Sequence, residues 1–210
     1  SAWPRPGRRR NLGEDLPDLR ISGVNTLDLD LTIPLPVNAH TNRVKGQVGL
    51  LGGNVILPGW SLELGRLRGE VHFTEANLYA KNVQALLRGE PIRLDLDLIG
   101  REGRRELQTR LQGRLGLRAL VGESTATALA PYVSGKSAWE AVLTTPTGHR
   151  EPRDAAPRFA LDVHSDLRGV AVQLPEPLGK TATQIRPLRI KLRPHPSEAL
   201  GLALEYGEEA

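Results

Sequence analysis

Residues 25–37 read Asn25-Thr-Leu-Asp-Leu-Asp-Leu-Thr-Ile-Pro-Leu-Pro-Val37, with an apolar side chain at every second position from Leu27 to Leu35. Asp28 and Asp30 lie between these apolar residues. Because a β-strand projects successive side chains to opposite faces, this segment would carry one apolar face and one charged face. The sequence therefore predicts a two-faced strand here.

The same alternation returns in three later stretches, at residues 92–98, 159–163 and 188–192. Repeated two-faced strands predict an all-β protein whose strands share an apolar wall. The residues expected to line this wall are Leu27, Leu29, Leu31, Ile33, Ile92, Leu94, Leu96, Leu98, Leu161, Val163, Leu188, Ile190 and Leu192.

Turn residues divide the remainder of the chain into short strands. Gly52-Gly53-Asn54 and Glu75-Ala76-Asn77 are typical turn sequences. A helical interruption is expected near 116–134, because Leu117, Leu120 and Val121 have helical spacing. Strands are expected at about 18–22, 26–35, 43–51, 53–58, 60–65, 67–74, 76–81, 91–99, 106–114, 158–165, 169–174, 185–193 and 199–206.

A short pattern with a central glycine recurs in these strands, as in Val44-Lys-Gly46-Gln-Val48 and Leu111-Gln-Gly113-Arg-Leu115. Gly69 and, more loosely, Gly169 have the same setting. Glycine inside a strand often marks a bulge or a bend. The recurrence therefore predicts a sheet that curves repeatedly.

The composition of the 210 residues favours a folded chain without disulfides, since there is no cysteine and 39% of the residues are hydrophobic. No window is long and apolar enough for a membrane helix. Residues 1–17 are polar and unpatterned, so we expect a linker or frayed end there and a single β-rich domain over 18–210. Ser1 in place of methionine, and a last strand that stops near Tyr206, lead us to expect a piece of a longer protein.

No group of residues has the pattern of a catalytic, metal or cofactor site. The five histidines are dispersed, and Gly135-Lys136-Ser137 lacks the first glycine and the preceding strand of a phosphate-binding loop. Only eight residues are aromatic, and they are not interleaved with basic residues as in proteins that bind single-stranded nucleic acid. We therefore expect no catalytic residue, no metal, no cofactor and no nucleic-acid partner.

The alternation by itself fits two architectures. A closed β-sandwich would use the apolar sides as a dry core and would serve as a structural or interaction module. A long, curved, mainly antiparallel sheet would instead leave those sides lining an open groove. Strand pattern alone keeps both open.

One stretch carries a specific resemblance. Ser165-Asp-Leu-Arg-Gly-Val-Ala-Val-Gln-Leu-Pro-Glu-Pro-Leu-Gly-Lys180 resembles a segment of the large AsmA-like envelope proteins of the YhdP type, in which it follows a strand. Residues 69–81 with Gly89-Glu-Pro91, and 133–141 around Trp139, resemble the same proteins, so the likeness covers about 65–193. The motif positions are Ser165, Gly169, Leu174, Pro175, Pro177, Leu178 and Lys180.

This resemblance implies the periplasmic portion of an inner-membrane-anchored protein of a Gram-negative bacterium. It favours the open groove, and it implies a non-enzymatic role in which the groove conducts phospholipid, or another acyl lipid, between the inner and outer membranes. Further envelope proteins would be a second class of partner, and membrane contact would come only through parts of the parent chain outside these residues. For the motif itself two interpretations stay open: a rigid turn or crossover with Lys180 solvated, or a role at the groove mouth.

Overall fold

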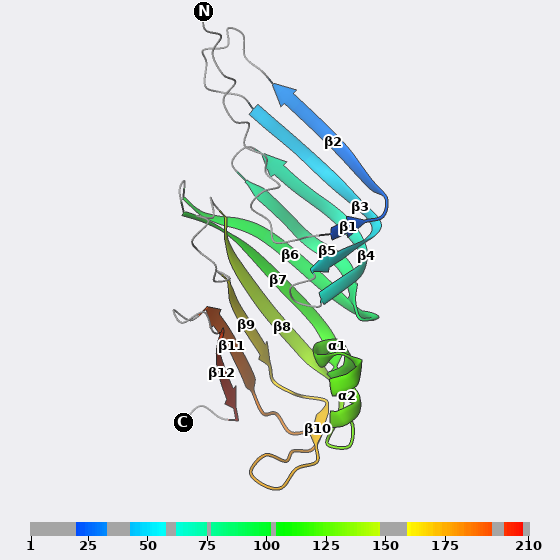
Figure 1. Cartoon of the computed structure of the whole chain (residues 1–210), viewed down its shortest axis with the longest axis vertical. Coiled ribbons are helices and arrows are strands. Elements are labelled where there is room, and N and C mark those ends of the chain that lie inside the picture. Colours follow the sequence, from blue (N-terminus) through cyan, green and yellow to red (C-terminus); the bar gives the residue numbers. More distant parts are fainter. Residues whose placement is uncertain are drawn as a thin grey trace, which may run out of the picture.

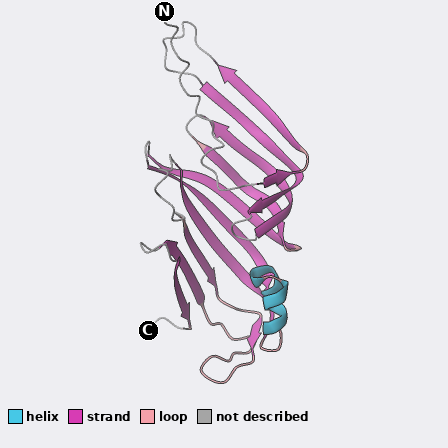
Figure 2. Cartoon of the chain, in the orientation of Figure 1, coloured by secondary structure: helices cyan, strands magenta, loops and turns pink. Residues whose placement is uncertain are grey.

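The computed structural model describes residues 20–32, 43–57, 62–74, 77–101, 104–147, 159–194 and 200–207. These residues form twelve strands and two short helices, which follow one another along an elongated molecule (Figure 1, Figure 2). The predicted all-β class is confirmed. The predicted linker over 1–17 and the apolar residue Ile33 lie outside the described residues, and the single domain over 18–210 stays a prediction.

All the strands belong to one antiparallel sheet whose path runs β1-β3-β4-β5-β6-β7-β8-β9-β11-β12. β2 also pairs with β3, and β10 pairs with β8. The strands are β1 (Arg20–Ser22), β2 (Asn25–Thr32), β3 (Arg43–Leu57), β4 (Leu62–Thr74), β5 (Leu78–Leu87), β6 (Glu90–Arg101), β7 (Arg104–Gly116), β8 (Val133–Thr147), β9 (Ala160–Ser165), β10 (Val170–Val172), β11 (Leu188–Pro194) and β12 (Leu200–Tyr206).

The sheet does not close on itself. Among the described residues, β12 pairs only with β11, and β1 and β2 pair only with β3. The two edges of the sheet therefore lie at opposite ends of the strand order (Figure 1). The open sheet is confirmed, and the alternative of a closed β-sandwich is wrong for these strands.

Antiparallel register carries one apolar row across ten strands. Each residue of the row is the direct cross-strand partner of the next, and the only polar member is a threonine. Directly opposed side chains on one face lie close enough to pack. The row is Leu27, Val48, Val71, Ala80, Leu96, Thr109, Leu143, Leu161, Leu192 and Leu202.

The hydrophobic core lies in the middle of this face and toward the helices. Ala80, Val83, Leu94 and Leu115 are between 0% and 4% exposed, and Ala119 of helix α1 (Leu117–Val121) joins them at 1%. The helix thus covers one end of the apolar face. Among the described residues, no helix packs on the strands at the two edges.

The helical interruption appears within the predicted range, as α1 and a second helix, α2 (Glu123–Leu129). Gly122 separates the two with a φ of 80°, a left-handed value that favours glycine and ends the first helix. Both helices lie beside β10 at one end of β7 and β8 (Figure 1).

Several predicted strand boundaries are wrong. Gly52-Gly53-Asn54 is not a turn: β3 runs through it, as does β4 through the predicted break at Arg66. The extra residues are absorbed by register shifts between β3 and β4 on either side of Gly53. β5 continues past residue 81 to Leu87, and β8 begins at Val133, inside the range predicted for the helical interruption.

The recurrent glycines have two different roles. Gly69 lies within a register shift between β4 and β5, as predicted for a bulge. Gly46 and Gly113 lie in regular pairing instead. A Cβ atom on Gly113 would lie 2.9 Å from Cγ2 of Ile92, so this glycine makes room for a cross-strand neighbour on the apolar face.

Candidate functional site

The candidate site is the apolar face of the sheet, defined here as the cross-strand row of ten residues together with the residues on the same side of the same strands. Every predicted wall residue that the structure describes with its side chain lies on this face. Leu27 and Leu29 come from β2, Ile92, Leu94, Leu96 and Leu98 from β6, Leu161 and Val163 from β9, and Leu188, Ile190 and Leu192 from β11. Leu31 is in β2, and its side chain lies outside the description.

The predicted wall omitted residues that complete this face. Val48, Val71, Leu143 and Leu202 fill the row between the predicted positions. Leu64 and Leu115 belong to the core. β3 and β4 also alternate, but glycines and bulges interrupt the two-residue period. The sequence pattern therefore predicts several shorter strands at 43–57 and 62–74.

Exposure changes steeply along the apolar face. Leu27 and Leu29 at one edge are 65% and 52% exposed, and Leu202 and Leu204 at the other edge are 64% and 59% exposed. Leu94, halfway between, is 4% exposed. Soluble proteins rarely leave such apolar patches without a use. The two edges therefore present apolar surface that could hold an apolar ligand, while the middle is packed.

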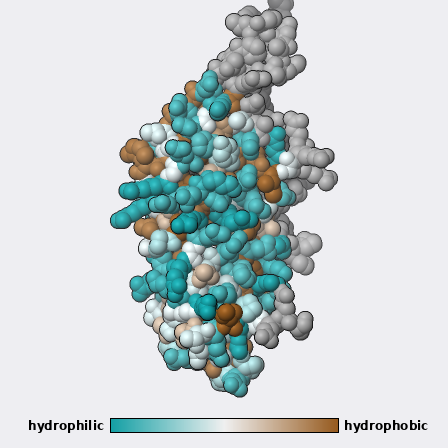
Figure 3. Space-filling model, turned by 180° about the vertical axis from the view of Figure 1, so that it is seen from behind, coloured by the Kyte–Doolittle hydropathy of each residue, from teal (hydrophilic) through white to brown (hydrophobic). Residues whose placement is uncertain are grey.

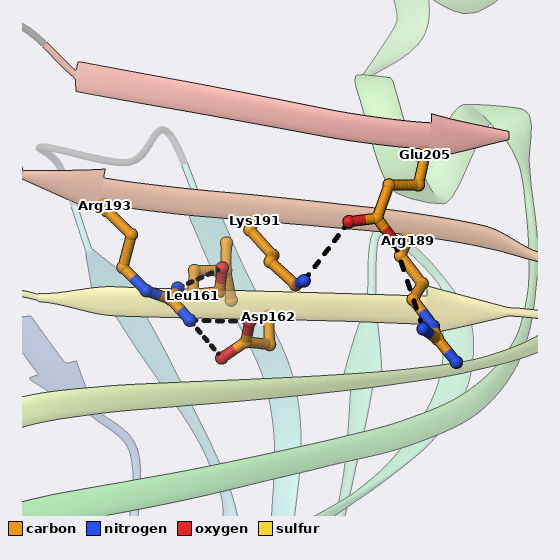
Figure 4. Close-up of polar contacts among 6 residues, drawn as sticks. All are labelled: Leu161, Asp162, Arg189, Lys191, Arg193 and Glu205. Atoms are coloured by element: carbon orange, nitrogen blue, oxygen red, sulfur yellow. Dashed lines mark hydrogen bonds and ion pairs between the residues drawn. The ribbon is translucent and has the colours of Figure 1, made fainter. Parts of the chain in front are cut away.

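The opposite face of the sheet is charged, and cross-strand pairs neutralise part of it. On β9, β11 and β12, Arg193 binds both carboxylate oxygens of Asp162 at 2.7 and 2.8 Å, and Lys191 lies 3.3 Å from Glu205 (Figure 4). Figure 3, seen from behind the view of Figure 1, shows a mostly hydrophilic surface with small separate hydrophobic patches. The two-faced character read from the sequence therefore holds across the sheet.

The motif at residues 165–180 forms a loop that is tied to β8 through a buried serine. The Oγ of Ser165, a residue 1% exposed, donates to the Ala138 carbonyl at 2.7 Å and accepts the Leu167 N–H at 3.1 Å. Because its one proton goes to Ala138, the Oγ of Ser137, 3.0 Å away, donates to it as well. Leu167 and Gly169 both adopt positive φ, 51° and 94°.

Lys180 closes the same loop. It is 6% exposed, and its Nζ donates to the carbonyls of Leu167, at 2.8 Å, and of Val170. Its backbone also pairs with Val172. The interpretation in which Lys180 is merely solvated is wrong, because the lysine is a buried internal cap of the loop.

The Leu-Pro-x-Pro-Leu part of the motif projects from this anchored base. Gly179 N–H donates to the Pro175 carbonyl at 3.2 Å, and Tyr206 on β12 donates its hydroxyl to the Leu178 carbonyl at 2.8 Å. Leu174 and Leu178 are 39% and 51% exposed. These contacts fix the Leu-Pro-x-Pro-Leu segment as a turn anchored to β12. A role for this segment at the groove mouth stays a prediction.

Burial lowers the pKa of Lys180, the nearby Arg186 lowers it further, and Asp166 partly opposes both. A neutral lysine amine still has two N–H groups for the two carbonyls. Since the folded protein holds this proton less tightly than the unfolded chain, stability should rise with pH between the lowered pKa and the ordinary value near 10.5.

We expect Lys180→Met to remove this alkaline gain. The measurement is the free energy of unfolding in urea as a function of pH, for the wild type and the variant side by side. Lys45→Met, at an exposed lysine of β3, is the control and should keep the wild-type slope. If the free energy of unfolding rose equally with pH in the wild type and in Lys180→Met, Lys180 would not be the source of the alkaline gain.

Metal-ligand clusters and membrane-spanning helices are absent from the part of the chain that the structure describes. There, no group of three or more histidines, cysteines or acidic residues could hold a metal ion. None of the described helices has the length and apolarity to cross a membrane.

The fold and the site define a class: an open antiparallel sheet with one continuous apolar face, covered in the middle and bare at both edges. Within that class, the chain belongs to the YhdP protein family, whose pattern matches residues 9–210. It is 25% identical over 182 residues to the intermembrane phospholipid transporter YhdP of Escherichia coli (strain K12). The match covers 87% of this chain and 14% of that protein. No solved structure matches the chain significantly.

Proposed function

We propose that this chain is a non-enzymatic segment of a lipid-transport protein and that its apolar face is part of a groove that conducts phospholipid between the inner and outer membranes. The observation that carries the proposal is the apolar row across ten strands, together with the exposed leucines at both edges. The family relationship supports the same function, since the relative from Escherichia coli is named as an intermembrane phospholipid transporter.

The physical need for such a face follows from the cargo. A diacyl phospholipid carries on the order of 30 methylenes, each worth about 0.8 kcal/mol when removed from water. Passage through water would therefore be prohibitive. A wall of leucine, isoleucine and valine makes the step from bilayer to protein nearly neutral in free energy, which suits transport better than tight binding does.

The dimensions of the sheet suit this role. β6 has 12 residues, which at about 3.3 Å per residue span about 40 Å. That is wide enough for a sheet to curve around acyl chains. The headgroup would stay at the open side of the groove, in contact with water.

The same proposal places the chain in the periplasm, as part of a longer inner-membrane-anchored protein of a Gram-negative bacterium. Other envelope proteins are proposed as further partners. Phospholipid, or another acyl lipid, is the proposed cargo.

A crosslinking experiment tests the groove directly. A benzophenone side chain is placed at Leu29 or Leu204 on the apolar face, and at the adjacent Asp28 or Ala203 on the charged face as matched controls. Because neighbouring strand residues face opposite sides, we expect about tenfold more crosslinked phospholipid at the leucine positions. Native mass spectrometry of the purified chain should also detect bound phospholipid. Equal crosslinking at both faces would contradict the groove.

A further inference from the structure

The charged face of the sheet contains a hollow that the proposed function does not use. It has a volume of about 670 Å³ and lies over β4, β5, β6 and β7. Its polar lining consists of Arg66, Arg68, Gln84, Arg93 and Gln112. None of the described residues that line it carries a carboxylate.

Sheet register is what brings these side chains together. Arg68, Gln84, Arg93 and Gln112 are successive direct partners across four strands. They alternate along their strands with buried residues such as Leu67 and Leu94, so they lie on the face opposite the apolar row. Arginine and amide side chains thus form a strip of hydrogen-bond donors, and at its end the Gln112 amide donates to the Glu140 carboxylate at 3.3 Å.

Within the described residues, the arginines of the hollow lack the ion pair that four other cations of this face make. Lys81, Arg110, Lys191 and Arg193 each lie within 4.0 Å of a carboxylate. Within the described part of the chain, no carboxylate pairs with Arg66, Arg68 or Arg93. Three guanidinium groups that make no ion pair give the hollow a positive character. Asp95 shares a smaller neighbouring hollow with Arg93, and its carboxylate accepts the Asn82 N–H at 2.7 Å.

The local backbone is also unusual at this place. Arg66 has a φ of 53°, a left-handed value that costs free energy for a residue with a side chain. It lies in a register shift between Gly65 and Arg68, and the Asn54 side chain accepts its N–H at 3.1 Å. A bulge held in this way sets Arg66 and Arg68 on either side of Leu67, both toward the hollow.

From these observations we propose that the hollow is a binding site for a ligand with two or more phosphate groups or a comparably dense negative charge. Guanidinium groups match phosphate oxygens with paired hydrogen bonds, and the glutamine amides add neutral donors. The site lies on the opposite face from the apolar row, so it does not depend on the lipid groove. Free phosphorylated compounds and anionic lipid headgroups share this chemistry.

Binding is measured in two arms that separate these sources. In the first, inorganic pyrophosphate is titrated into the chain by calorimetry. In the second, the chain is sedimented with phosphatidylcholine vesicles with and without phosphatidylglycerol. Arg68→Gln/Arg93→Gln removes two guanidinium groups from the hollow. Arg189→Gln/Arg193→Gln removes the same charge from the same face outside it. Thermal unfolding shows that each variant is folded.

We expect the hollow variant to weaken binding by about tenfold or more while the control stays close to wild type. Arg68→Lys/Arg93→Lys keeps the positive charge but removes the paired N–H donors of the guanidinium groups, so this variant should bind with intermediate affinity. If the hollow variant loses binding only to pyrophosphate, the ligand is a free phosphorylated compound. If it loses binding to vesicles that contain phosphatidylglycerol, the ligand is a lipid headgroup. The proposal is overturned if neither arm shows binding that depends on the hollow, or if the control loses as much as the hollow variant.

Discussion

Leu94→Lys is expected to unfold the protein or to lower its free energy of unfolding by about 3–5 kcal/mol, because it would bury an unpaired charge. Leu94 is 4% exposed and packs in the core between β5 and β7. Thermal and urea unfolding, followed by circular dichroism, measure the change.

Leu27→Lys is the matched control. Leu27 and Leu94 each begin the same pentapeptide, Leu-Asp-Leu-Asp-Leu, and both lie on the apolar face. Leu27 is 65% exposed at the edge of the sheet, so its substitution should change stability by no more than about 0.5 kcal/mol. Similar losses from both substitutions would mean that the edge of the face is also covered, against the open groove.

Ser165→Ala is expected to cost about 2–3 kcal/mol, because it leaves the buried Leu167 N–H and the Ser137 hydroxyl without their partner. Removing the hydroxyl also frees the Ala138 carbonyl. The loop from β9 to β10 should then loosen, which faster amide hydrogen exchange at Leu167 would report alongside the lower unfolding free energy.

Ser134→Ala serves as the control for this prediction. Ser134 lies on the same strand as Ser137 but is exposed. Its substitution should change stability by less than about 0.5 kcal/mol. If Ser165→Ala were equally mild, the hydroxyl network would not be what holds the motif in place.

The motif at residues 165–180 identified the family from sequence but did not predict the burial of its lysine. The positions from Ser165 to Lys180 were found by resemblance, and the chain does belong to that family. The resemblance carried no information on burial, and Lys180 turned out to be enclosed rather than solvated. A lysine between an exposed loop and a strand has no local signal of burial, since its two carbonyl partners lie 10 and 13 residues earlier in the chain.

The arginine hollow could not be predicted from the sequence, because it also depends on residues that are far apart in the chain. Arg68 and Arg93 are 25 positions apart, and each looks like an ordinary outward-facing strand residue. Their proximity depends on the register of β4, β5 and β6, which includes three shifts. The sequence pattern predicts strand ends at Gly65 and Lys81, where the structure has register shifts within continuous strands.

Sequence alone determined that the strands are two-faced, because the two-residue period of a β-strand is a local property of the chain. It also located the helical interruption and the wall residues on β2, β6, β9 and β11. Only the tertiary structure decided which part of the apolar face is covered. The pentapeptide that begins at Leu27 lies on an edge strand and is exposed, while its copy at Leu94 lies between β5 and β7 and is buried, because burial depends on neighbours that the local sequence does not encode.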